Sequence, residues 1–161
     1  MTNAPTQTIL DIKAIIKHQR NRYPVLLIDK IVDLVPGERA TGIKCFTYNE
    51  WFFPGHFDDE PNVPGFVLIE SLVQTFILTF LCKEEYAGMK TNFVSIDNIR
   101  YKRKIVPGDV LRIEASLKSF KRGIAIGSAI SFVDGESACS AEFVVAVPAI
   151  LDQFKPRTKS V

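Results

Sequence analysis

One apolar segment limits most strongly what this chain can fold into. Residues 66–82 read FVLIESLVQTFILTFLC, and the helix that such a run predicts is apolar on nearly all sides. The segment falls short of the roughly 20 residues that a bilayer span needs, and Glu70 near its start is costly in lipid. We therefore expect a helix over residues 66–85 that is buried in a soluble, cytoplasmic protein, with no membrane insertion.

Short apolar stretches separated by turn signals flank this segment and predict β-strands. Two strands, over residues 26–35 and 38–47, form a hairpin turned by Pro36-Gly37. Antiparallel strands with one apolar face must cover something, and only the central helix is apolar enough to be covered. The sequence thus predicts an α+β fold in which a curved antiparallel sheet wraps around one long buried helix. The four remaining strands are expected over residues 93–105, 110–120, 124–133 and 136–147.

The length of 161 residues suits one domain, taken as residues 1–161. Residues 1–20 contain a short amphipathic helix, expected over residues 8–17 with Thr8 as its cap. Residues 148–161 are polar and basic, and we expect a loosely ordered tail there. The first residues lack a basic leader followed by a long apolar stretch, so no targeting segment is expected.

The charge balance and the few metal-binding side chains exclude several classes of function. The 20 basic and 18 acidic residues give a net charge of +2, which makes no global case for nucleic-acid binding. Cys45, Cys82 and Cys139 are odd in number and far apart, which argues against a disulfide framework or a cysteine-based zinc site. His18 and His56 are too few for a three-histidine site. We expect no metal and no nucleic-acid partner.

A polar pair interrupts the apolar helix and is the first candidate for chemistry. Glu70 and Gln74 are four residues apart and share one helical face, with Ser71 and Thr75 beside them. Buried polar groups must be hydrogen-bonded or line a cavity. The simplest alternative is that Glu70 forms a structural ion pair with an arginine such as Arg22.

The second candidate is His56, in the proline- and glycine-rich loop before the helix. Its neighbours in FFPGHF are aromatic, so we expect a constrained, dry place, although a loop histidine is more often a surface residue. Gly65 follows Pro64 at the predicted start of the helix, where backbone N–H groups lack internal partners and can bind an oxyanion. Base, carboxyl acid and amide donor together suit proton removal next to a carbonyl, with loss or gain of a group on the adjacent carbon.

These elements together resemble a known family. The segment FFPGHFDDEPNVPGFVLIESLVQ is similar to the signature of the β-hydroxyacyl-acyl-carrier-protein dehydratases of the FabZ type, which have the hotdog fold. The resemblance extends over about residues 22–147 and implies a sheet wrapped around a central helix. The matching positions are Phe52, Phe53, Gly55, His56, Phe57, Pro61, Pro64, Gly65, Ile69, Glu70 and Gln74.

The resemblance implies a reaction and roles for individual residues. His56 would take a proton from C2 of a (3R)-3-hydroxyacyl thioester, and Glu70 would help the 3-hydroxyl leave as water. The Gly65 N–H would polarise the thioester carbonyl, and no metal or nucleotide would be needed. In this family two subunits share each site, their sheets join, and the dimers often assemble into hexamers. A substrate tunnel would be lined by Phe57, Val63, Pro64, Phe66 and Gln74.

The family's substrate travels on the phosphopantetheine arm of acyl carrier protein, which is acidic. A basic cluster is the candidate surface for that partner, although on charge alone it could equally be a solvated sheet edge. Its members are Arg100, Lys102, Arg103, Lys104, Lys121 and Arg122.

Two other functions remain open from the residues. One is a hotdog thioesterase that hydrolyses the thioester with an activated water. The other is a non-catalytic acyl-binding subunit that keeps only the fold. Asp58-Asp59, Val63 and Phe66 depart from the family's usual residues, so acyl-chain length and pathway, whether fatty-acid or specialised lipid or polyene synthesis, stay open.

Overall fold

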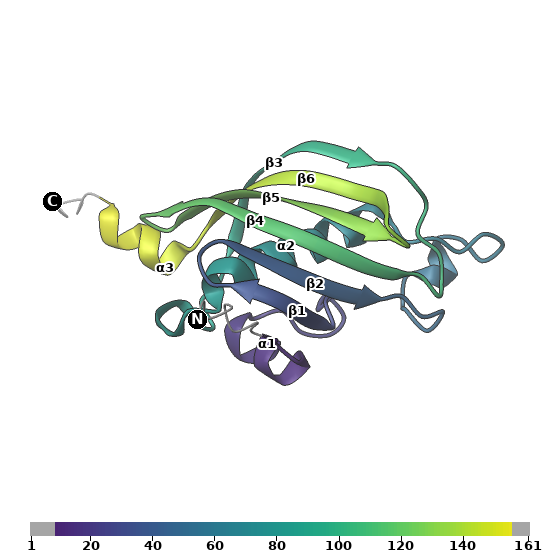
Figure 1. Cartoon of the computed structure of the whole chain (residues 1–161), viewed down its shortest axis with the longest axis horizontal. Coiled ribbons are helices and arrows are strands. Elements are labelled where there is room, and N and C mark those ends of the chain that lie inside the picture. Colours follow the sequence, from purple (N-terminus) through teal and green to yellow (C-terminus); the bar gives the residue numbers. More distant parts are fainter. Residues whose placement is uncertain (1–8, 156–161) are drawn as a thin grey trace, which may run out of the picture.

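The fold is a six-stranded antiparallel sheet curved around one long helix (Figure 1). The computed structural model describes residues 9–155. The helix α2 (Gly65–Leu81) lies in the concave side of the sheet, whose strand order is β1-β2-β4-β5-β6-β3. The predicted α+β architecture is therefore confirmed. The strands are β1 (Lys30–Val35), β2 (Arg39–Cys45), β3 (Asn92–Tyr101), β4 (Val110–Lys121), β5 (Ile124–Val133) and β6 (Glu136–Ala146).

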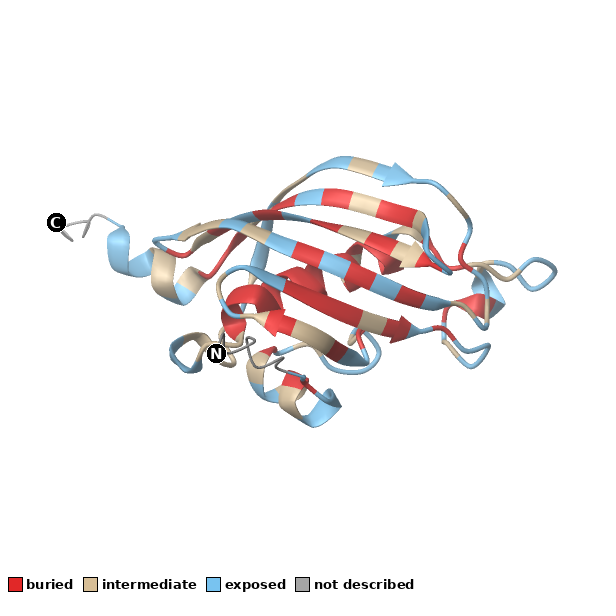
Figure 2. Ribbon diagram, in the orientation of Figure 1, coloured by how far each residue is buried: buried red, intermediate tan, exposed pale blue. Residues whose placement is uncertain are grey.

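Alternating side chains give the sheet one buried and one exposed face. In β4, Leu111, Ile113 and Ala115 are buried against α2, while the residues between them face solvent (Figure 2). The hairpin between β5 and β6 turns at Asp134-Gly135, where both residues have positive φ, 51° and 80°. This conformation matches the twist of the flanking strands and needs glycine at the second position.

Aromatic rings fill the space between α2 and the sheet. Phe76 stacks on Phe143 of β6 with ring centroids 5.7 Å apart, and Phe80 stacks on Phe120 of β4 at 4.7 Å. Gly127 of β5 lies directly below Phe76, because a Cβ there would be 2.4 Å from the ring. The missing side chain lets the helix approach the sheet closely.

The central helix is shorter than the predicted range of 66–85. Its last residue is Leu81, and the N–H of Lys83 already bonds back to Phe80 O, a tighter turn that ends the helix. The chain then forms η2 (Glu84–Tyr86) and reverses at Gly88, whose φ is +72°. The polar residues after Cys82 therefore belong to a turn rather than to the buried helix.

Other predicted boundaries also need correction. The first helix, α1 (Ile12–His18), is capped by the Asp11 carboxylate, which accepts from Ala14 N at 2.8 Å. Thr8, the predicted cap, lies outside the described residues. The first strand begins at Lys30 rather than residue 26, and β3 ends at Tyr101 rather than residue 105.

The segment after β6 is more regular than expected. Instead of a loose tail from Pro148, it forms α3 (Pro148–Leu151) and η3 (Asp152–Phe154). The Arg122 guanidinium lies over the Phe154 ring, 5.7 Å from its centroid, which holds this end against the β4–β5 turn. The rest of the predicted tail, residues 156–161, lies outside the described part of the chain.

Strand β3 forms one edge of the sheet and is unusually exposed. It pairs only with β6, and Phe93 and Val94 are 45% and 60% exposed. This ten-residue edge, with exposed Phe93 and Val94, is open to pairing with another strand. Within residues 9–155, no helix is long and apolar enough to cross a membrane.

Candidate active site

Backbone hydrogen bonds hold the loop that carries His56. The N–H of His56 donates to Phe53 O at 3.1 Å, at the end of η1 (Phe53–Gly55), and Asn62 N donates to His56 O at 3.0 Å. Val63 N bonds to Ile105 O at 2.8 Å and ties the loop to the strand region beyond β3. The conformation of the loop is thus fixed mainly by main-chain groups.

A single contact assigns the tautomer of His56. Its Nδ1 lies 3.0 Å from the carbonyl oxygen of Asn62. Because a carbonyl can only accept, Nδ1 carries the hydrogen, so in the neutral imidazole the lone pair lies on Nε2. The contact thus selects the tautomer in which Nε2 is the nitrogen that can accept a proton.

The surroundings of His56 are less dry than the sequence suggested. The imidazole is half-buried and stacks on Phe57 at 4.5 Å between ring centroids, but Phe57 itself is 51% exposed. Asp58 and Asp59 are also exposed. Phe57 therefore orients the imidazole plane of His56 but does not shield the imidazole from solvent.

His56 and Gly65 line one pocket, called here the histidine pocket, with a volume of about 440 Å³. Gly65 is the first residue of α2, and no described residue accepts a hydrogen bond from its N–H. The Tyr101 hydroxyl lies against Gly65, since a Cβ there would meet it at 2.9 Å. The pocket thus brings together His56 and Gly65, while their roles as base and amide donor stay predictions. Asn62, Val63, Leu68, Lys102, Arg103, Lys104 and Ile105 complete the lining.

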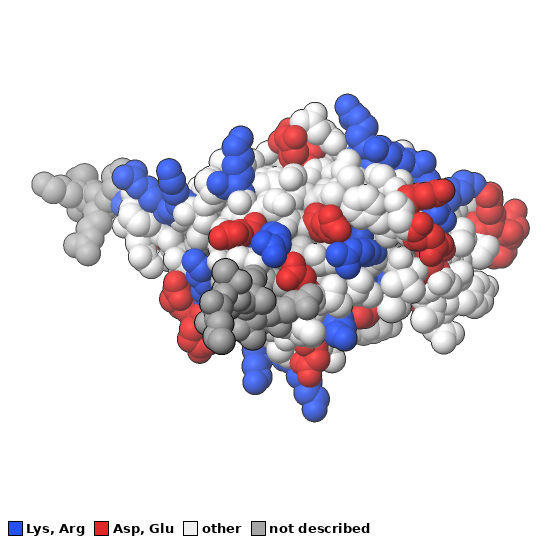
Figure 3. Space-filling view, in the orientation of Figure 1, with Lys and Arg blue, Asp and Glu red and all other residues white. Residues whose placement is uncertain are grey.

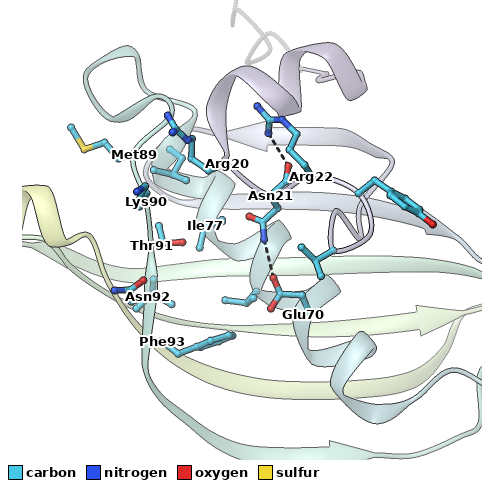
Figure 4. Close-up of a pocket in the computed structure, with 15 residues that line it drawn as sticks. Arg20, Asn21, Arg22, Glu70, Ile77, Met89, Lys90, Thr91, Asn92 and Phe93 are labelled. Carbon is cyan, nitrogen blue, oxygen red and sulfur yellow. Dashed lines mark hydrogen bonds between the residues drawn. The ribbon is translucent and has the colours of Figure 1, made fainter. Parts of the chain in front are cut away.

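Glu70 is held by side chains rather than by backbone. Its Oε1 accepts from Asn21 Nδ2 at 3.2 Å (Figure 4). It also accepts from Gln74 Nε2 at 2.8 Å, and no hydrogen bond from residues 9–155 reaches Oε2. Burial raises the pKa of the Glu70 carboxyl above the ordinary 4.5, and the two hydrogen bonds offset part of that rise. The carboxyl group is therefore biased toward the protonated form that can donate to a leaving oxygen.

Gln74 connects Glu70 to the chain before β1. Its Nε2 also donates to Val25 O at 2.6 Å, and its Oε1 accepts from Leu27 N at 2.8 Å. Gln74 is fully buried and all these contacts occupy its amide group. It positions Glu70, and it lines none of the pockets described here, although we expected it in the tunnel.

The alternative in which Glu70 forms an ion pair with Arg22 is not what the structure contains. The Arg22 guanidinium donates instead to three carbonyl oxygens, those of Ile16, Gln19 and Asn21. These contacts hold the chain after α1 in place. They include the backbone of Asn21, whose side chain donates to Glu70.

The other polar residues of α2 are structural. Ser71 Oγ donates to Val67 O at 2.8 Å, Thr75 Oγ1 donates to Ser71 O at 3.1 Å, and both side chains are fully buried. They satisfy their hydroxyl groups within the helix itself. Among the polar side chains of α2, Glu70 and Gln74 form hydrogen bonds with described residues outside the helix.

Glu70 lines two pockets, and neither is the histidine pocket. The larger, called here the glutamate groove, has a volume of about 650 Å³ and runs along α2 past Val73, Ile77 and Leu81. The second, the apolar groove, has about 590 Å³ and is walled by Trp51, Phe66 and Tyr101 among others. Tyr101 also lines the histidine pocket, so it stands between the two catalytic candidates.

The residues predicted to line a tunnel are divided among these spaces. Val63 lines the histidine pocket, whereas Phe66, 63% exposed, lines the apolar groove. Pro64 is buried and caps α2, and Phe57 stacks on His56. A continuous tunnel stays a prediction.

The predicted basic cluster is two separate groups. Lys102, Arg103 and Lys104 line the histidine pocket, whereas Lys121 and Arg122 lie at the β4–β5 turn, near the opposite end of the strands. The register explains this, because Tyr101 pairs with Cys139, near one end of β6, while Lys121 pairs with Ile124, opposite its other end. Figure 3 shows Lys and Arg side chains near both ends of the long axis.

Acidic residues already engage part of the group at the histidine pocket. Lys104 forms an ion pair with Glu60, and Arg103 lies 3.4 Å from Glu136 and 3.7 Å from Asp109. Lys102 makes no ion pair within the described residues and is exposed. The Arg100 side chain is also exposed, and among the described residues it donates only to the carbonyl of Ile99.

Sequence reasoning missed two residues of the site. Asn21 lies 49 residues before Glu70, and Tyr101 reaches Gly65 from the end of β3. No local motif marks either of them, because both contacts arise from the packing of distant segments.

Comparisons with known proteins show the family of this chain. Residues 20–142 match the model of the FabA-like domain family. The chain is 46% identical over 139 residues to the 3-hydroxyacyl-[acyl-carrier-protein] dehydratase FabZ of Bacillus cereus, covering 86% of this chain and 94% of that protein. It is 45% identical over the same length to FabZ of Clostridium novyi, covering 96% of it.

A solved structure supports the fold independently. The dehydratase heterocomplex ApeI:P from Xenorhabdus doucetiae contains a chain that superposes with a TM-score of 0.74 at 14% identity. The match covers 86% of this chain and 95% of that one. At such low identity the superposition speaks to the fold alone.

Proposed function

Since this chain belongs to the FabA-like family, alongside the FabZ dehydratases, we propose that it converts 3-hydroxyacyl-acyl-carrier-protein to the trans-2-enoyl form in fatty-acid or related lipid synthesis. The observation that carries the mechanism is the contact of His56 Nδ1 with Asn62 O, which reserves Nε2 for proton transfer in a pocket that Gly65 also lines. Sequence identity of 45% over most of the chain supports the reaction class.

His56 begins the reaction at C2 of the substrate. Its Nε2 takes the C2 proton, and the electron pair of the broken C–H bond moves toward the thioester carbonyl. The Gly65 N–H, at the positive end of the α2 dipole, stabilises the negative charge that develops on that oxygen.

Glu70 completes the elimination at C3. Its raised pKa favours a protonated carboxyl, which donates to the 3-hydroxyl as the C3–O bond breaks. A C2=C3 double bond forms, water leaves, and a proton passes from His56 back to Glu70 before the next turnover. The reaction balances without an oxidant, a reductant or a resident cofactor.

We also propose that each active site is shared by two copies of the chain. Within one copy, His56 and Glu70 line different pockets on either side of Tyr101. The exposed apolar edge of β3 is suited to pairing with β3 of a second copy, which would join the two sheets about a two-fold axis. A trimer of such dimers stays a prediction.

Mixing two inactive variants tests the shared site. In a dimer of His56→Ala and Glu70→Gln chains, one site would lose both groups and the other would keep both. Statistical exchange of subunits should then restore about a quarter of the wild-type sites. If His56 and Glu70 act within one chain, the mixture will stay as inactive as its components.

The partner that presents the substrate is proposed to be acyl carrier protein, at the mouth of the histidine pocket. The exposed, unpaired Lys102 and the neighbouring Arg100 give this rim positive charge toward an acidic protein. Lys102→Glu should raise KM for carrier-protein substrates and leave short pantetheine substrates almost unchanged. Lys118→Glu, on the outer face of the sheet, is the matched control. Equal effects on both substrate types would contradict the proposal.

One incubation separates the dehydratase from its alternatives. The protein is given 3-hydroxyacyl and trans-2-enoyl carrier-protein substrates, and the products are identified by mass. Interconversion by loss or gain of water supports the proposal. Free acid would indicate a thioesterase, and intact substrate would indicate a non-catalytic acyl-binding subunit. We propose a cytoplasmic location, in which three unpaired cysteines remain reduced.

A further inference from the structure

The two ends of the glutamate groove differ in chemistry. At one end Glu70 is half-buried among Val25, Val73 and Phe93. The far end is lined by two cations, Arg20 and Lys90, with further polar and sulfur-containing neighbours (Figure 4). Those neighbours are Met89, Thr91 and Asn92.

The middle of the groove is an apolar wall. Val73, Ile77 and Leu81 follow one another at four-residue spacing on one face of α2, and all three are buried. From Glu70 to Leu81 the helix rises about 16 Å, at about 1.5 Å per residue. The wall therefore suits an extended hydrocarbon chain that starts near Glu70.

The cations at the far end are brought together by a backbone contact. The N–H of Gly88 donates to His18 O at 2.9 Å, which holds the segment after α2 against the end of α1. Arg20 lies two positions after His18, Lys90 lies two positions after Gly88, and both line the groove. Neither forms an ion pair with any residue of the described range 9–155.

No acid within the groove balances this charge. Glu70 is the one carboxylate among its lining residues and stands at the opposite end. Arg22 is a third cation of the lining, but three backbone carbonyls occupy its guanidinium. The far end thus presents a positive potential with two free donors, and guanidinium and ammonium groups match carboxylates well.

We propose that the glutamate groove accepts 3-hydroxyacyl chains whose far end carries a carboxylate, which Arg20 and Lys90 receive. The inference rests on the proposed dehydratase function and names the substrate class of that site. A methyl end would gain only the contacts of the apolar wall. A carboxylate end gains these contacts and two charge-assisted hydrogen bonds as well.

The test compares two carrier-protein substrates of equal length, one ending in a methyl group and one in a carboxylate. We measure the ratio of kcat/KM for the carboxylate substrate to that for the methyl substrate, across a series of chain lengths. In the variant with Arg20→Gln and Lys90→Gln, the ratio should fall about tenfold at the chain length that reaches the far end. The reason is that the substrate carboxylate loses its two solvent-exposed ion pairs, one with each cation. Raising the salt concentration should lower the wild-type ratio as well.

Two further variants separate charge from structure. Lys13→Gln with Lys118→Gln removes two exposed cations outside the groove and should leave the ratio unchanged. Arg20→Lys with Lys90→Arg keeps both charges and should keep the wild-type ratio. If the neutral groove variant keeps the wild-type ratio at every length, the inference is overturned.

Failure of the proposed function would look different. The wild-type protein would then dehydrate neither substrate, including the methyl-ended one, and the inference would fall with it. Dehydration of methyl-ended chains together with rejection of every carboxylate-ended chain would contradict the inference alone.

Discussion

His56 and Glu70 are held in place by two different kinds of contact. The loop around His56 is fixed by main-chain hydrogen bonds, both within the loop and from Val63 to Ile105, and the imidazole itself bonds to a backbone carbonyl. Glu70 is fixed by the side chains of Gln74 and Asn21, the second of which lies 49 residues away. The placement of His56 therefore depends on main-chain contacts, whereas the placement of Glu70 depends on side chains, one of them from a distant segment.

This difference predicts how each half of the site responds to substitution. Side chains around His56 should be replaceable wherever the backbone keeps its course. Side chains around Glu70 should not be, because each carries a hydrogen bond that the backbone cannot replace.

The largest effect is expected for His56→Ala. Removing the base should lower kcat by at least about a hundredfold, while the loop keeps its backbone hydrogen bonds. Rates measured with 3-hydroxyacyl carrier-protein substrate, together with an unchanged circular dichroism spectrum, check this. A variant with near wild-type kcat would rule out His56 as the base.

Glu70→Gln should lower the rate by a similar factor of about a hundred, but stabilise the protein at neutral pH. The raised pKa means that ionised Glu70 costs stability, and that cost grows as pH rises above 4.5 and is complete above the raised value. The variant should therefore melt at a higher temperature than wild type at pH 7, and at a similar temperature below pH 4.5. Thermal melts at both pH values check the sign, and a lower melting temperature at pH 7 would contradict it.

Asn21→Ala should have an intermediate effect, about tenfold on kcat, the size expected for one hydrogen bond to an ionisable group. The Asn21 contact lowers the Glu70 pKa, so its loss should raise that pKa further. If protonated Glu70 is the acid, the high-pH limb of the pH–rate profile should move to higher pH. A general loss of packing would lower the rate without moving the limb.

The smallest effect is expected for Asn62→Ala, although Asn62 contacts His56 directly. The contact uses the backbone oxygen, which alanine retains, and the Asn62 side chain donates only to Glu60 O. The rate should stay within about twofold of wild type. A loss of kcat as large as that of Asn21→Ala would contradict the idea that His56 is held by main-chain rather than side-chain contacts.

The same distinction explains how much of the site could be predicted from the sequence. His56, Gly65 and the start of α2 lie within one short segment whose prolines and glycines mark a fixed loop, so their placement in one pocket was predictable. Asn21 and Tyr101 reach the site through tertiary packing and leave no local pattern. The alternative ion pair between Glu70 and Arg22 does not form, because backbone carbonyls at the end of α1 bind the guanidinium.

For the fold as well, features set by local sequence were predictable and features set by tertiary packing were not. Strand alternation and the turn at Asp134-Gly135 located β4, β5 and β6 to within one or two residues, because each depends on local periodicity and turn geometry. The prediction of one basic cluster was wrong. Lys102, Arg103 and Lys104 lie toward one end of the strands, and Lys121 and Arg122 lie toward the other. Antiparallel register, which no single segment encodes, decides which charges meet.

The three hydrogen bonds from Arg22 to backbone carbonyls have a consequence for how this protein loses activity on heating. The guanidinium joins Ile16 and Gln19, near the end of α1, to Asn21, and Asn21 in turn holds Glu70. α1 is a helix of only seven residues, and short peripheral helices open at lower free energy than a packed core. Partial opening of α1 would release the acid while the sheet stays folded, so thermal inactivation should precede the cooperative loss of secondary structure.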